Sequence, residues 1–345
     1  MKRLLACACI LWAGSAYAGI LGDLHPGQII QANGTDIEVP GYSVPSMVDW
    51  NNDGLADLMV GEGGGGTNPG LVRVYYNKGT ATDPQFTNFS YLQNGAGAIS
   101  VPSQGCLGSF PRAAYWDTDD LLDLVVGHAD GTISAYLNTG TAFDPVFDDG
   151  FQLTVSWPGV TLDVGARATV APVDWNNDGL LDLVVGGYDG TMHIYQNCGC
   201  GVGLPEFFYT INPTGVPVEM GEGDLVVPSL RSSPMVIDLD GDGKKDMLVG
   251  NTDGQLLAYY NTGSDEMPTF EEGLFLTANG EIIDLPGSAR SRPYVLDYNG
   301  DGYLDILVGA DDGKIHLFAS VPEPTTLLLM GIGGLALAVH RRRMF

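Results

Sequence analysis

Basic residues are scarce in this chain. Its 345 residues include 15 lysines and arginines against 42 aspartates and glutamates, which gives a formal net charge of −27 at pH 7. A surface of that sign repels the phosphates of nucleic acid and the headgroups of anionic lipids. We therefore expect no nucleic-acid partner. Bound divalent cations would neutralise part of this negative charge.

Sequence signatures of common enzyme classes are absent. The chain has no Gly-x-Ser-x-Gly motif, no His-Glu-x-x-His motif and no repeated cluster of histidine and cysteine. The glycine-rich run at residues 62–70 has no Gly-Lys-Ser/Thr after it, so it is typical of a hairpin tip and not of a phosphate-binding loop. The sequence therefore predicts a protein that is not an enzyme.

Cysteine is also rare, with five residues in all, of which two lie within residues 1–18. That segment has the pattern of a signal peptide, with two basic residues, an apolar stretch and an Ala-Tyr-Ala cleavage site. Its removal on export leaves Cys106, Cys198 and Cys200. An oxidising compartment permits one disulfide, which joins either Cys198 to Cys200 or one of these to Cys106.

No apolar run reaches the roughly 20 residues that a helix usually needs to cross a bilayer. The run at residues 325–339 is 15 residues long, or about 22 Å as a helix. Pro322-Glu323-Pro324 precedes it and three arginines follow it, which would hold the C-terminus in the cytoplasm. We predict a short hydrophobic transmembrane helix within residues 321–345.

One acidic motif recurs along the middle of the chain. It has acidic or amide side chains at positions 1, 3, 5 and 9 and glycine at position 6, and a Val-Gly strand follows it. The copies start at Asp49, Tyr115, Asp174, Asp238 and Asp297. Their period of 59 to 66 residues indicates stacked units that share one core.

The spacing of the motif suits a hard cation such as Ca²⁺. Alternate side-chain oxygens turn inward, glycine permits the sharp bend, and position 7 lends a backbone carbonyl. Four copies are intact, and we predict a calcium site in each, with an affinity on the order of 10⁻⁴ to 10⁻³ M. The predicted ligands at positions 1, 3, 5, 7 and 9 are Asp49, Asn51, Asp53, Leu55 and Asp57; Asp174, Asn176, Asp178, Leu180 and Asp182; Asp238, Asp240, Asp242, Lys244 and Asp246; and Asp297, Asn299, Asp301, Tyr303 and Asp305.

The second copy of the motif is damaged. Tyr115 stands where the other copies have aspartate at position 1, and Asp120 replaces glycine at position 6. Asp117, Asp119 and Asp123 remain as an incomplete ligand set for a fifth site.

Each repeat has four strand signals and no amphipathic helix. One apolar strand enters the acidic loop, a second leaves it, an Asp-Gly turn leads to a third, and a looser alternating strand completes the unit. This pattern predicts an all-β fold, a β-propeller of five four-stranded blades. A solenoid is the alternative, although its repeats are usually shorter.

The two ends of the repeat region resemble each other, since residues 28–41 match residues 274–287. The last repeat has three strand signals and stops near Ser320. The N-terminal segment would therefore supply the missing outer strand, which closes the ring and covers an exposed edge. The propeller is predicted to span residues 19–320.

The four intact loops, each followed by a Val-Gly strand, resemble FG-GAP/VCBS repeats, the calcium-loop propeller blades of the integrin alpha-chain type. The resemblance covers about residues 27–320. It implies that loop positions 1, 3, 5 and 9 hold Ca²⁺. We expect this calcium to be structural, because it offsets the repulsion among the carboxylates of each loop and stabilises the folded state.

The tail that begins at Pro322 resembles the PEP-CTERM sorting signal of Gram-negative bacteria. That resemblance implies recognition by an exosortase, transient anchoring in the inner membrane, removal of the helix, and release or transfer to the envelope or extracellular polymer. Such tails are often labelled an ice-binding-protein C-terminal domain. No flat face with regular threonines is evident in this sequence, so we expect no ice binding.

Two further sets of residues recur with the loops. Arg167, Arg231 and Arg290 each lie seven residues before position 1 and favour a repeated structural ion pair. Position 2 is bulky and favours a wedge against the neighbouring blade over an aromatic face that stacks on sugar rings. The residues at position 2 are Trp50, Trp116, Trp175, Leu239 and Tyr298.

These signals together favour an exported, calcium-stabilised propeller that acts as a binding or adhesion module, with polysaccharide or an envelope protein as its partner. One alternative is an enzyme that acts on extracellular polysaccharide at a mouth of the ring, and another is a purely structural matrix protein. Carboxylates or histidines outside the loops that converge at the axis would favour the enzyme.

Overall fold

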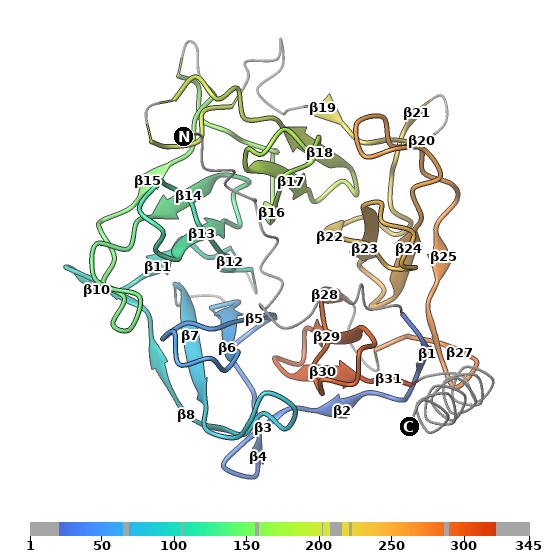
Figure 1. The fold of residues 1–345 in the computed structure, drawn as a ribbon, viewed down its shortest axis with the longest axis horizontal. Coiled ribbons are helices and arrows are strands. Elements are labelled where there is room, and N and C mark those ends of the chain that lie inside the picture. Colours follow the sequence, from blue (N-terminus) through green and yellow to red (C-terminus); the bar gives the residue numbers. More distant parts are fainter. Residues whose placement is uncertain are drawn as a thin grey trace, which may run out of the picture.

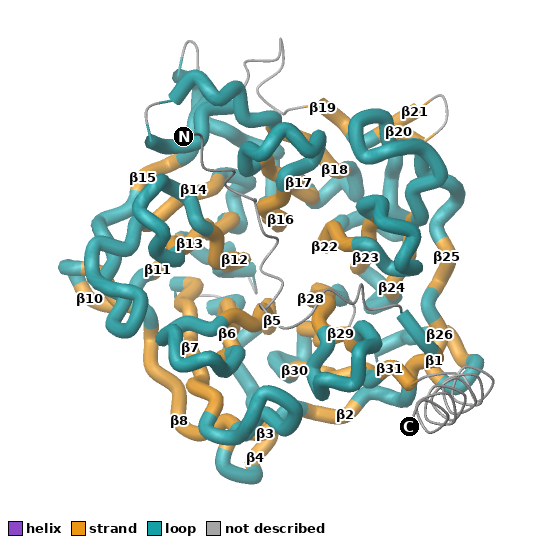
Figure 2. Tube along the Cα trace, in the orientation of Figure 1, coloured by secondary structure: helices purple, strands orange, loops and turns teal. Residues whose placement is uncertain are grey.

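The computed structural model describes residues 21–321, apart from residues 65–68, 105–106, 156–158, 202, 208–215, 221–222 and 286–289. Every regular element in these ranges is a β-strand, and the strands form sheets around a central axis (Figure 1). The all-β prediction is therefore confirmed. Figure 2 shows how much of the remaining described chain is loop and turn.

Five sheets share one plan, in which the innermost, second and third strands are antiparallel and pair in their order along the chain. The innermost strands are β5 (Ser43–Val48), β12 (Phe110–Ala114), β16 (Thr169–Val173), β22 (Ser233–Ile237) and β28 (Arg292–Leu296). The second strands are β6 (Asp57–Glu62), β13 (Asp123–Gly127), β17 (Asp182–Gly186), β23 (Asp246–Gly250) and β29 (Asp305–Gly309). The third strands are β7 (Gly70–Asn77), β14 (Ile133–Tyr136), β18 (Met192–Tyr195), β24 (Leu256–Tyr259) and β30 (Ile315–Phe318).

The outermost strands are β8 (Phe86–Tyr91), β15 (Phe151–Gln152), β19 (Val216–Pro217), β25 (Leu274–Phe275) and β2 (Gln28–Ile29). Short additional strands lie at the periphery: β1 (Asp23–Leu24), β3 (Gln31–Ala32), β4 (Thr35–Asp36), β9 (Gln93–Asn94), β10 (Gly97–Ala98), β11 (Ser100–Val101), β20 (Glu219–Met220), β21 (Gly223–Asp224), β26 (Thr277–Ala278), β27 (Glu281–Ile282) and β31 (Ser320–Val321).

The innermost strands contact one another in a closed cycle. β5 contacts β12, β12 contacts β16, β16 contacts β22, β22 contacts β28, and β28 returns to β5. The last sheet takes its outer strand from the N-terminal part of the chain, because Gln28 pairs with Leu317 and Ile29 with His316. The predicted closure by an N-terminal strand is therefore confirmed.

The second strands are buried on both faces, which explains why they read as continuous apolar runs. Each has a glycine at its last position, or at the position before it in β6, that faces the next sheet. A Cβ on Gly127 would lie 2.0 Å from the Ala168 carbonyl oxygen, and one on Gly309 would lie 2.2 Å from that of Ser43. The glycine of the Val-Gly signature therefore allows neighbouring sheets to pack closely.

The hydrophobic core is divided among the junctions between neighbouring sheets. One cluster joins the first and second sheets and contains Trp50, Val74, Leu124 and Phe147. Another joins the last sheet to the first, where Ile30 packs with residues such as Leu307 and Ile315. Because each cluster draws on two sheets, no single repeat can bury its apolar surface alone.

The predicted signal peptide, residues 1–18, and the predicted C-terminal helix beyond Val321 lie outside the described residues. Within the described residues, no helix has the length and apolar character that crossing a membrane requires.

Candidate metal centres

Each acidic loop joins the innermost strand of a sheet to its second strand, so all five loops lie at the same end of their sheets. Their backbones bend through left-handed conformations. Gly54, Gly179, Gly243 and Gly302, at position 6 of the intact loops, have φ between 84° and 90°. Glycine adopts this conformation without the steric penalty of a side chain, which is why position 6 favours it.

The carboxylate at position 9 is buried in all five loops. One of its oxygens accepts the backbone N–H of position 2 at 2.9–3.2 Å. The other accepts a backbone N–H at the end of the third strand, or just beyond it, at 2.7–2.8 Å. These carboxylates belong to Asp57, Asp123, Asp182, Asp246 and Asp305. Position 9 therefore fastens the loop to the sheet whether or not an ion is bound.

Positions 1 and 5 shape the tip of each intact loop. One oxygen of the position 1 carboxylate accepts the N–H of the position 6 glycine at 2.9–3.0 Å. The Oδ1 atom of position 5 accepts the N–H of position 7 at 2.9–3.0 Å. A carboxylate oxygen has two lone-pair sites, so these bonds leave acceptor capacity for a cation.

The fourth loop brings three carboxylates together. Single oxygens of Asp238, Asp240 and Asp246, at positions 1, 3 and 9, all lie within 4.8 Å of one another. The first, third and fifth loops carry asparagine at position 3, so they offer an amide oxygen in place of the third carboxylate. Oxygen donors at this spacing fit Ca²⁺, which prefers carboxylate and carbonyl ligands.

The electrostatics of the loops are unfavourable without a cation. Burial raises the pKa of Asp57, Asp123, Asp182, Asp246 and Asp305 to about 6, against a usual value near 3.8. Neighbouring loop carboxylates add to this rise, as Asp240 and Asp238 do for Asp246. A bound cation would favour the ionised form of each group.

Position 7 is Leu55, Leu180, Lys244 or Tyr303, each of which is half-buried and was predicted to lend its carbonyl. The N–H of each bonds to position 5, which fixes the peptide at that point. Lys244 differs, because its ammonium group lies 2.8 Å from the position 5 carboxylate of Asp242. In the fourth loop a lysine therefore offsets part of the negative charge that a cation would otherwise neutralise.

The damaged second loop keeps the same shape. Asp120 has φ of 64°, so an aspartate adopts the left-handed conformation that glycine takes elsewhere. Asp123 accepts backbone N–H groups from Trp116, Asp117 and Asn138. Tyr115 supplies no carboxylate at position 1 and is 50% exposed. The loop is folded without a complete set of oxygen donors.

Asparagines at or just after the end of the third strand brace the connection that follows it, a role that was not predicted from the sequence. In the fourth sheet, Oδ1 of Asn261 accepts the N–H groups of Gly263 and Thr269, both at 3.0 Å. Equivalent bonds are made by Asn77, Asn138 and Asn197. The Asn-x-Gly repeat in the sequence was the signal for this bracing.

The aromatic residues at position 2 do not form an open binding face. Trp50, Trp116 and Trp175 are 2–5% exposed. Each packs on a phenylalanine of the next repeat, with ring centroids of Trp50 and Phe147 5.7 Å apart, and with Phe207 and Phe270 in the corresponding roles. The wedge interpretation is the one that the geometry supports, and stacking of these rings on sugars is excluded by their burial.

The prediction of a repeated ion pair at Arg167, Arg231 and Arg290 is wrong for the described residues. These arginines precede the innermost strands, at the end opposite the acidic loops. They lie over the rings of Phe110, Tyr188 and Tyr42 at 5.3, 4.7 and 4.6 Å. Among them, Arg290 alone has a carboxylate within ion-pair range in the part described, Asp311 at 3.6 Å.

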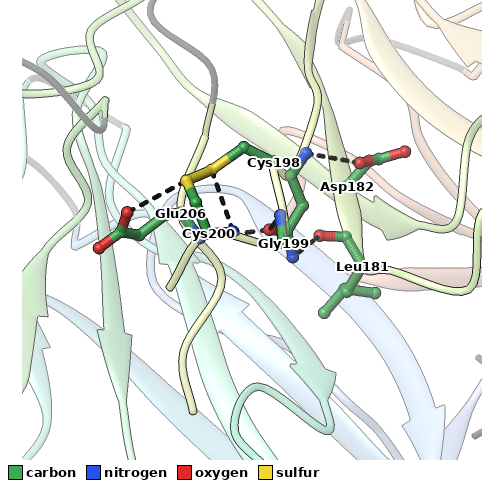
Figure 3. Close-up of a disulfide and its surroundings, with 7 residues drawn as sticks. Leu181, Asp182, Cys198, Gly199, Cys200 and Glu206 are labelled. Carbon is green, nitrogen blue, oxygen red and sulfur yellow. Dashed lines mark hydrogen bonds between the residues drawn. A yellow bond between two sulfur atoms is a disulfide. The ribbon is translucent and has the colours of Figure 1, made fainter. Parts of the chain in front are cut away.

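A disulfide lies beside the third loop. It joins Cys198 to Cys200, whose Cα atoms are 5.2 Å apart, and Figure 3 shows it next to Leu181 and Asp182. This is the first of the pairings that the sequence left open, and Cys106 lies outside the described residues. The disulfide constrains the connection that follows the bracing residue Asn197.

Comparisons with known families agree with this geometry. The FG-GAP-like repeat matches residues 238–308, and the PEP-CTERM protein-sorting motif matches residues 320–343. The chain therefore carries an integrin-alpha-like FG-GAP repeat and an exosortase-type sorting motif, as the sequence resemblance implied. The sorting motif indicates an exported, surface-directed protein that an exosortase processes.

Individual relatives are distant. Integrin alpha-4 of Xenopus laevis is 28% identical over 174 residues, which are 46% of this chain and 16% of the relative. Among solved structures, the Photorhabdus luminescens Tc holotoxin pore is 20% identical with a TM-score of 0.41, over 92% of this chain and 14% of that one. BBS1N in complex with ARL6DN is 11% identical with a TM-score of 0.37, over 88% of this chain and 98% of that one. The chain spans a small part of the length of the curated relative.

Proposed function

We propose that this chain is an exported, calcium-stabilised, five-bladed propeller that serves as a binding module of the cell envelope or extracellular matrix. The observation that carries the proposal is the set of loops with aspartate at position 1 and a buried aspartate at position 9, in a chain that ends in a sorting motif. The closed cycle of innermost strands supports the count of five blades.

Calcium is proposed to bind in the four intact loops and to act as a structural ion. The ligands would be the side chains at positions 1, 3, 5 and 9 and the carbonyl at position 7. The converging carboxylates of Asp238, Asp240 and Asp246 support this for the fourth loop. When bound, the ion would supply charge neutralisation, while the protein's own N–H groups keep the loop in shape.

The partner is proposed to be a surface polysaccharide, bound at the loop end of the second sheet. Tyr115 there is 50% exposed, where the intact loops have aspartate. Phe143, in the connection that follows β14 at the same end of the sheet, is 69% exposed. Exposed aromatic rings offer an apolar face on which sugar rings stack, and the Tyr115 hydroxyl adds a polar group for hydrogen bonding. An envelope protein is the alternative partner.

The enzyme alternative finds less support. Its expected mark was a cluster of carboxylates or histidines at the axis. The described residues that line the axial cavity are instead apolar, small or basic. We therefore propose a role without catalysis.

The deciding experiment is retention of the purified exported chain on the extracellular polysaccharide of its host bacterium, with calcium and with a chelator. We expect calcium-dependent retention that falls at least about tenfold in a Tyr115→Ala, Phe143→Ala double variant, since exposed aromatic hot spots are worth about 2 kcal/mol or more. Depolymerisation of the polysaccharide would overturn the proposal in favour of an enzyme.

Tyr188→Ala is the matched control, because Tyr188 is 45% exposed but follows β17 at the opposite end of its sheet. It should bind like the wild type. An equal loss of retention in the control would mean that the loop end of the second sheet is not the binding site. No retention by a folded wild-type protein would shift the proposal to a protein partner or a structural role.

A further inference from the structure

A cysteine pair replaces hydroxyl side chains in the connection that follows the third strand of the third sheet. In the first, second and fourth sheets, the third residue after the bracing asparagine carries a hydroxyl group that accepts a backbone N–H and closes a turn, at 3.0–3.2 Å. These residues are Thr80, Thr141 and Ser264. Cys200 has this place in the third sheet, where its bond to Cys198 holds the connection.

The side-chain amide of the bracing asparagine also has a different partner in the third sheet. In the other three sheets, its Nδ2 atom donates to the carbonyl of the same third residue, at 3.2–3.5 Å. In the third sheet, Nδ2 of Asn197 donates to the carbonyl of Leu181, within the acidic loop, at 3.3 Å. Among the described residues of these four sheets, the disulfide therefore coincides with an amide that ties the connection to the acidic loop.

The disulfide-bonded segment contacts three consecutive positions of the third acidic loop, as Figure 3 shows for Leu181 and Asp182. Leu181 is position 8 of that loop. At position 9, Asp182 accepts the backbone N–H of Asn197 at 2.7 Å. At position 7, the Leu180 side chain packs against the turn, since a Cβ on Gly199 would lie 3.0 Å from Leu180 Cδ1. The conformation of residues 197–199 therefore bears directly on the acidic loop.

The disulfide is accessible to a reductant. Cys200 is exposed and Cys198 is half-buried, and exposed disulfides are the labile ones that exchange with thiols. The two cysteines are separated by 2 in the sequence, so the bond closes a very short loop and constrains the unfolded chain little. Global stability is therefore a weak explanation for it. Oε2 of Glu206 lies 3.4 Å from Sγ of Cys200 and can accept the thiol proton that reduction leaves there.

We propose that Cys198 and Cys200 form a thiol–disulfide switch on the third acidic loop, which a dithiol reductant opens. One thiolate of the reductant attacks Sγ of the exposed Cys200, the bond to Cys198 breaks, and Cys198 leaves as a thiolate that takes up a proton. The second thiolate of the reductant then attacks the reductant's own sulfur in the mixed disulfide and releases Cys200, which is protonated in turn. Two electrons and two protons pass to the cysteines, and the reductant becomes a disulfide.

Reduction changes what holds the third loop in place. Once the bond is broken, Asn197 is free to donate to the Cys200 carbonyl, as its counterparts do in the other sheets, and the Leu181 carbonyl loses its donor. A thiol at Cys200 is a weak acceptor and does not replace the hydroxyl that closes the turn elsewhere. The effect on calcium rests on the proposed function. We expect the affinity of the third loop for Ca²⁺ to fall about fivefold, the factor that one lost hydrogen bond gives.

The test is hydrogen exchange of the purified exported chain in chelator, with and without dithiothreitol, in a Cys106→Ser background so that two cysteines remain. Alkylation and mass spectrometry count the thiols that appear at Cys198 and Cys200 in the folded protein. We expect the Asn197 amide to exchange about fivefold faster after reduction. The Asn261 amide, which donates to the position 9 carboxylate of the fourth loop at 2.8 Å, should be unchanged. No alkylation of the folded chain, or equal exchange at Asn197 in the two states, would overturn the proposal.

A Cys198→Thr, Cys200→Thr double variant is the matched control, because the second sheet has threonine at both places. Its exchange should not respond to dithiothreitol, and a response equal to that of the wild type would also overturn the proposal.

Calcium titration of the oxidised and reduced chain measures the coupling to the metal. We expect one site to weaken about fivefold on reduction, and this change to be absent in Asp178→Ala, which lacks the position 5 carboxylate of the third loop. Faster exchange at Asn197 in a chain that binds no calcium would support the switch and reject the proposed metal site, so the two failures are distinguishable.

Discussion

At the scale of single residues, positions within one loop have different physical roles. The position 9 carboxylate is buried and accepts backbone N–H groups in every loop, including the damaged one. The position 5 carboxylate is exposed and holds one N–H. Variants at position 9 therefore test folding, while variants at position 5 are better suited to test calcium binding.

Asp178→Ala and Asp119→Ala form a matched pair at position 5. Each loses one hydrogen bond to position 7, from Leu180 at 2.9 Å and from Leu121 at 2.8 Å. At a calcium concentration about 100 times Kd, one site adds about 2.7 kcal/mol of stability. In calcium, we expect the free energy of unfolding to fall by about 2.7 kcal/mol more in Asp178→Ala than in Asp119→Ala. In chelator, the two variants should lose similar amounts. Urea unfolding measures both differences.

Equal losses in calcium would mean that the second loop also binds an ion. Equal stability of the wild type in calcium and in chelator would instead refute a structural role for the metal.

The buried position 9 groups also predict how calcium stabilisation depends on pH. Their folded pKa of about 6 lies above the usual value near 3.8, so without calcium they favour the folded state below pH 3.8 and lose that contribution as pH rises through 6. Protons and calcium compete for these oxygens. We expect the difference in unfolding free energy between calcium and chelator to shrink from pH 7 to pH 5. Parallel pH profiles in the two conditions would contradict this.

At the scale of elements, the sequence was most informative where one residue type is physically required. Asp-Gly turns and the Val-Gly strand ends were readable, because a left-handed turn and a close approach between sheets both favour glycine. Asn33 and Asn279 both have φ near 50°, as the matching segments around them implied. Two-residue outer strands such as β19 could not be located from the sequence. Such a strand exists because it pairs with its neighbour, and its own side chains carry little signal.

The candidate sites divide in the same way. Loop spacing predicted where carboxylates converge, as Asp238, Asp240 and Asp246 do. The meeting of Arg112, Arg167 and Arg292 near the axis was not predicted, because ring closure brings them together from strands far apart in the chain.

Gly309→Ala tests the seam between the last sheet and the first. The added Cβ would lie 2.2 Å from the Ser43 carbonyl oxygen, and overpacking of this kind costs about 1–3 kcal/mol. Gly95→Ala is the control, since nothing lies within 4 Å of its Cβ position, and it should change stability by less than about 0.5 kcal/mol. Thermal melting of both variants measures the difference, and equal melting temperatures would argue against close packing at the seam.

At the scale of the whole molecule, the ring makes distant sheets depend on one another. Ile30 is 6% exposed, and its N–H donates to the Ile315 carbonyl at 2.9 Å, so it belongs to the closing core. Ile30→Ala should cost about 2–5 kcal/mol, whereas Gln28→Ala, on the exposed side of β2, should cost little.

The measurement for Ile30→Ala is hydrogen exchange of β17, in the third sheet and away from the seam. If the ring unfolds as one unit, the free energy of exchange of the β17 amides falls by the full amount that Ile30→Ala costs at the seam. Unchanged protection at β17 would mean that the sheets unfold independently.

The pairing of β2 with β30 has a consequence for the order of events after synthesis. The backbone N–H of Gly22 donates to the hydroxyl of Ser320, 298 residues further along. Contacts of such long sequence separation form late and slowly. In an exported chain, the N-terminal strand emerges first and has no partner until residues 315–318 have followed. Its edge therefore stays unpaired until the last sheet is complete.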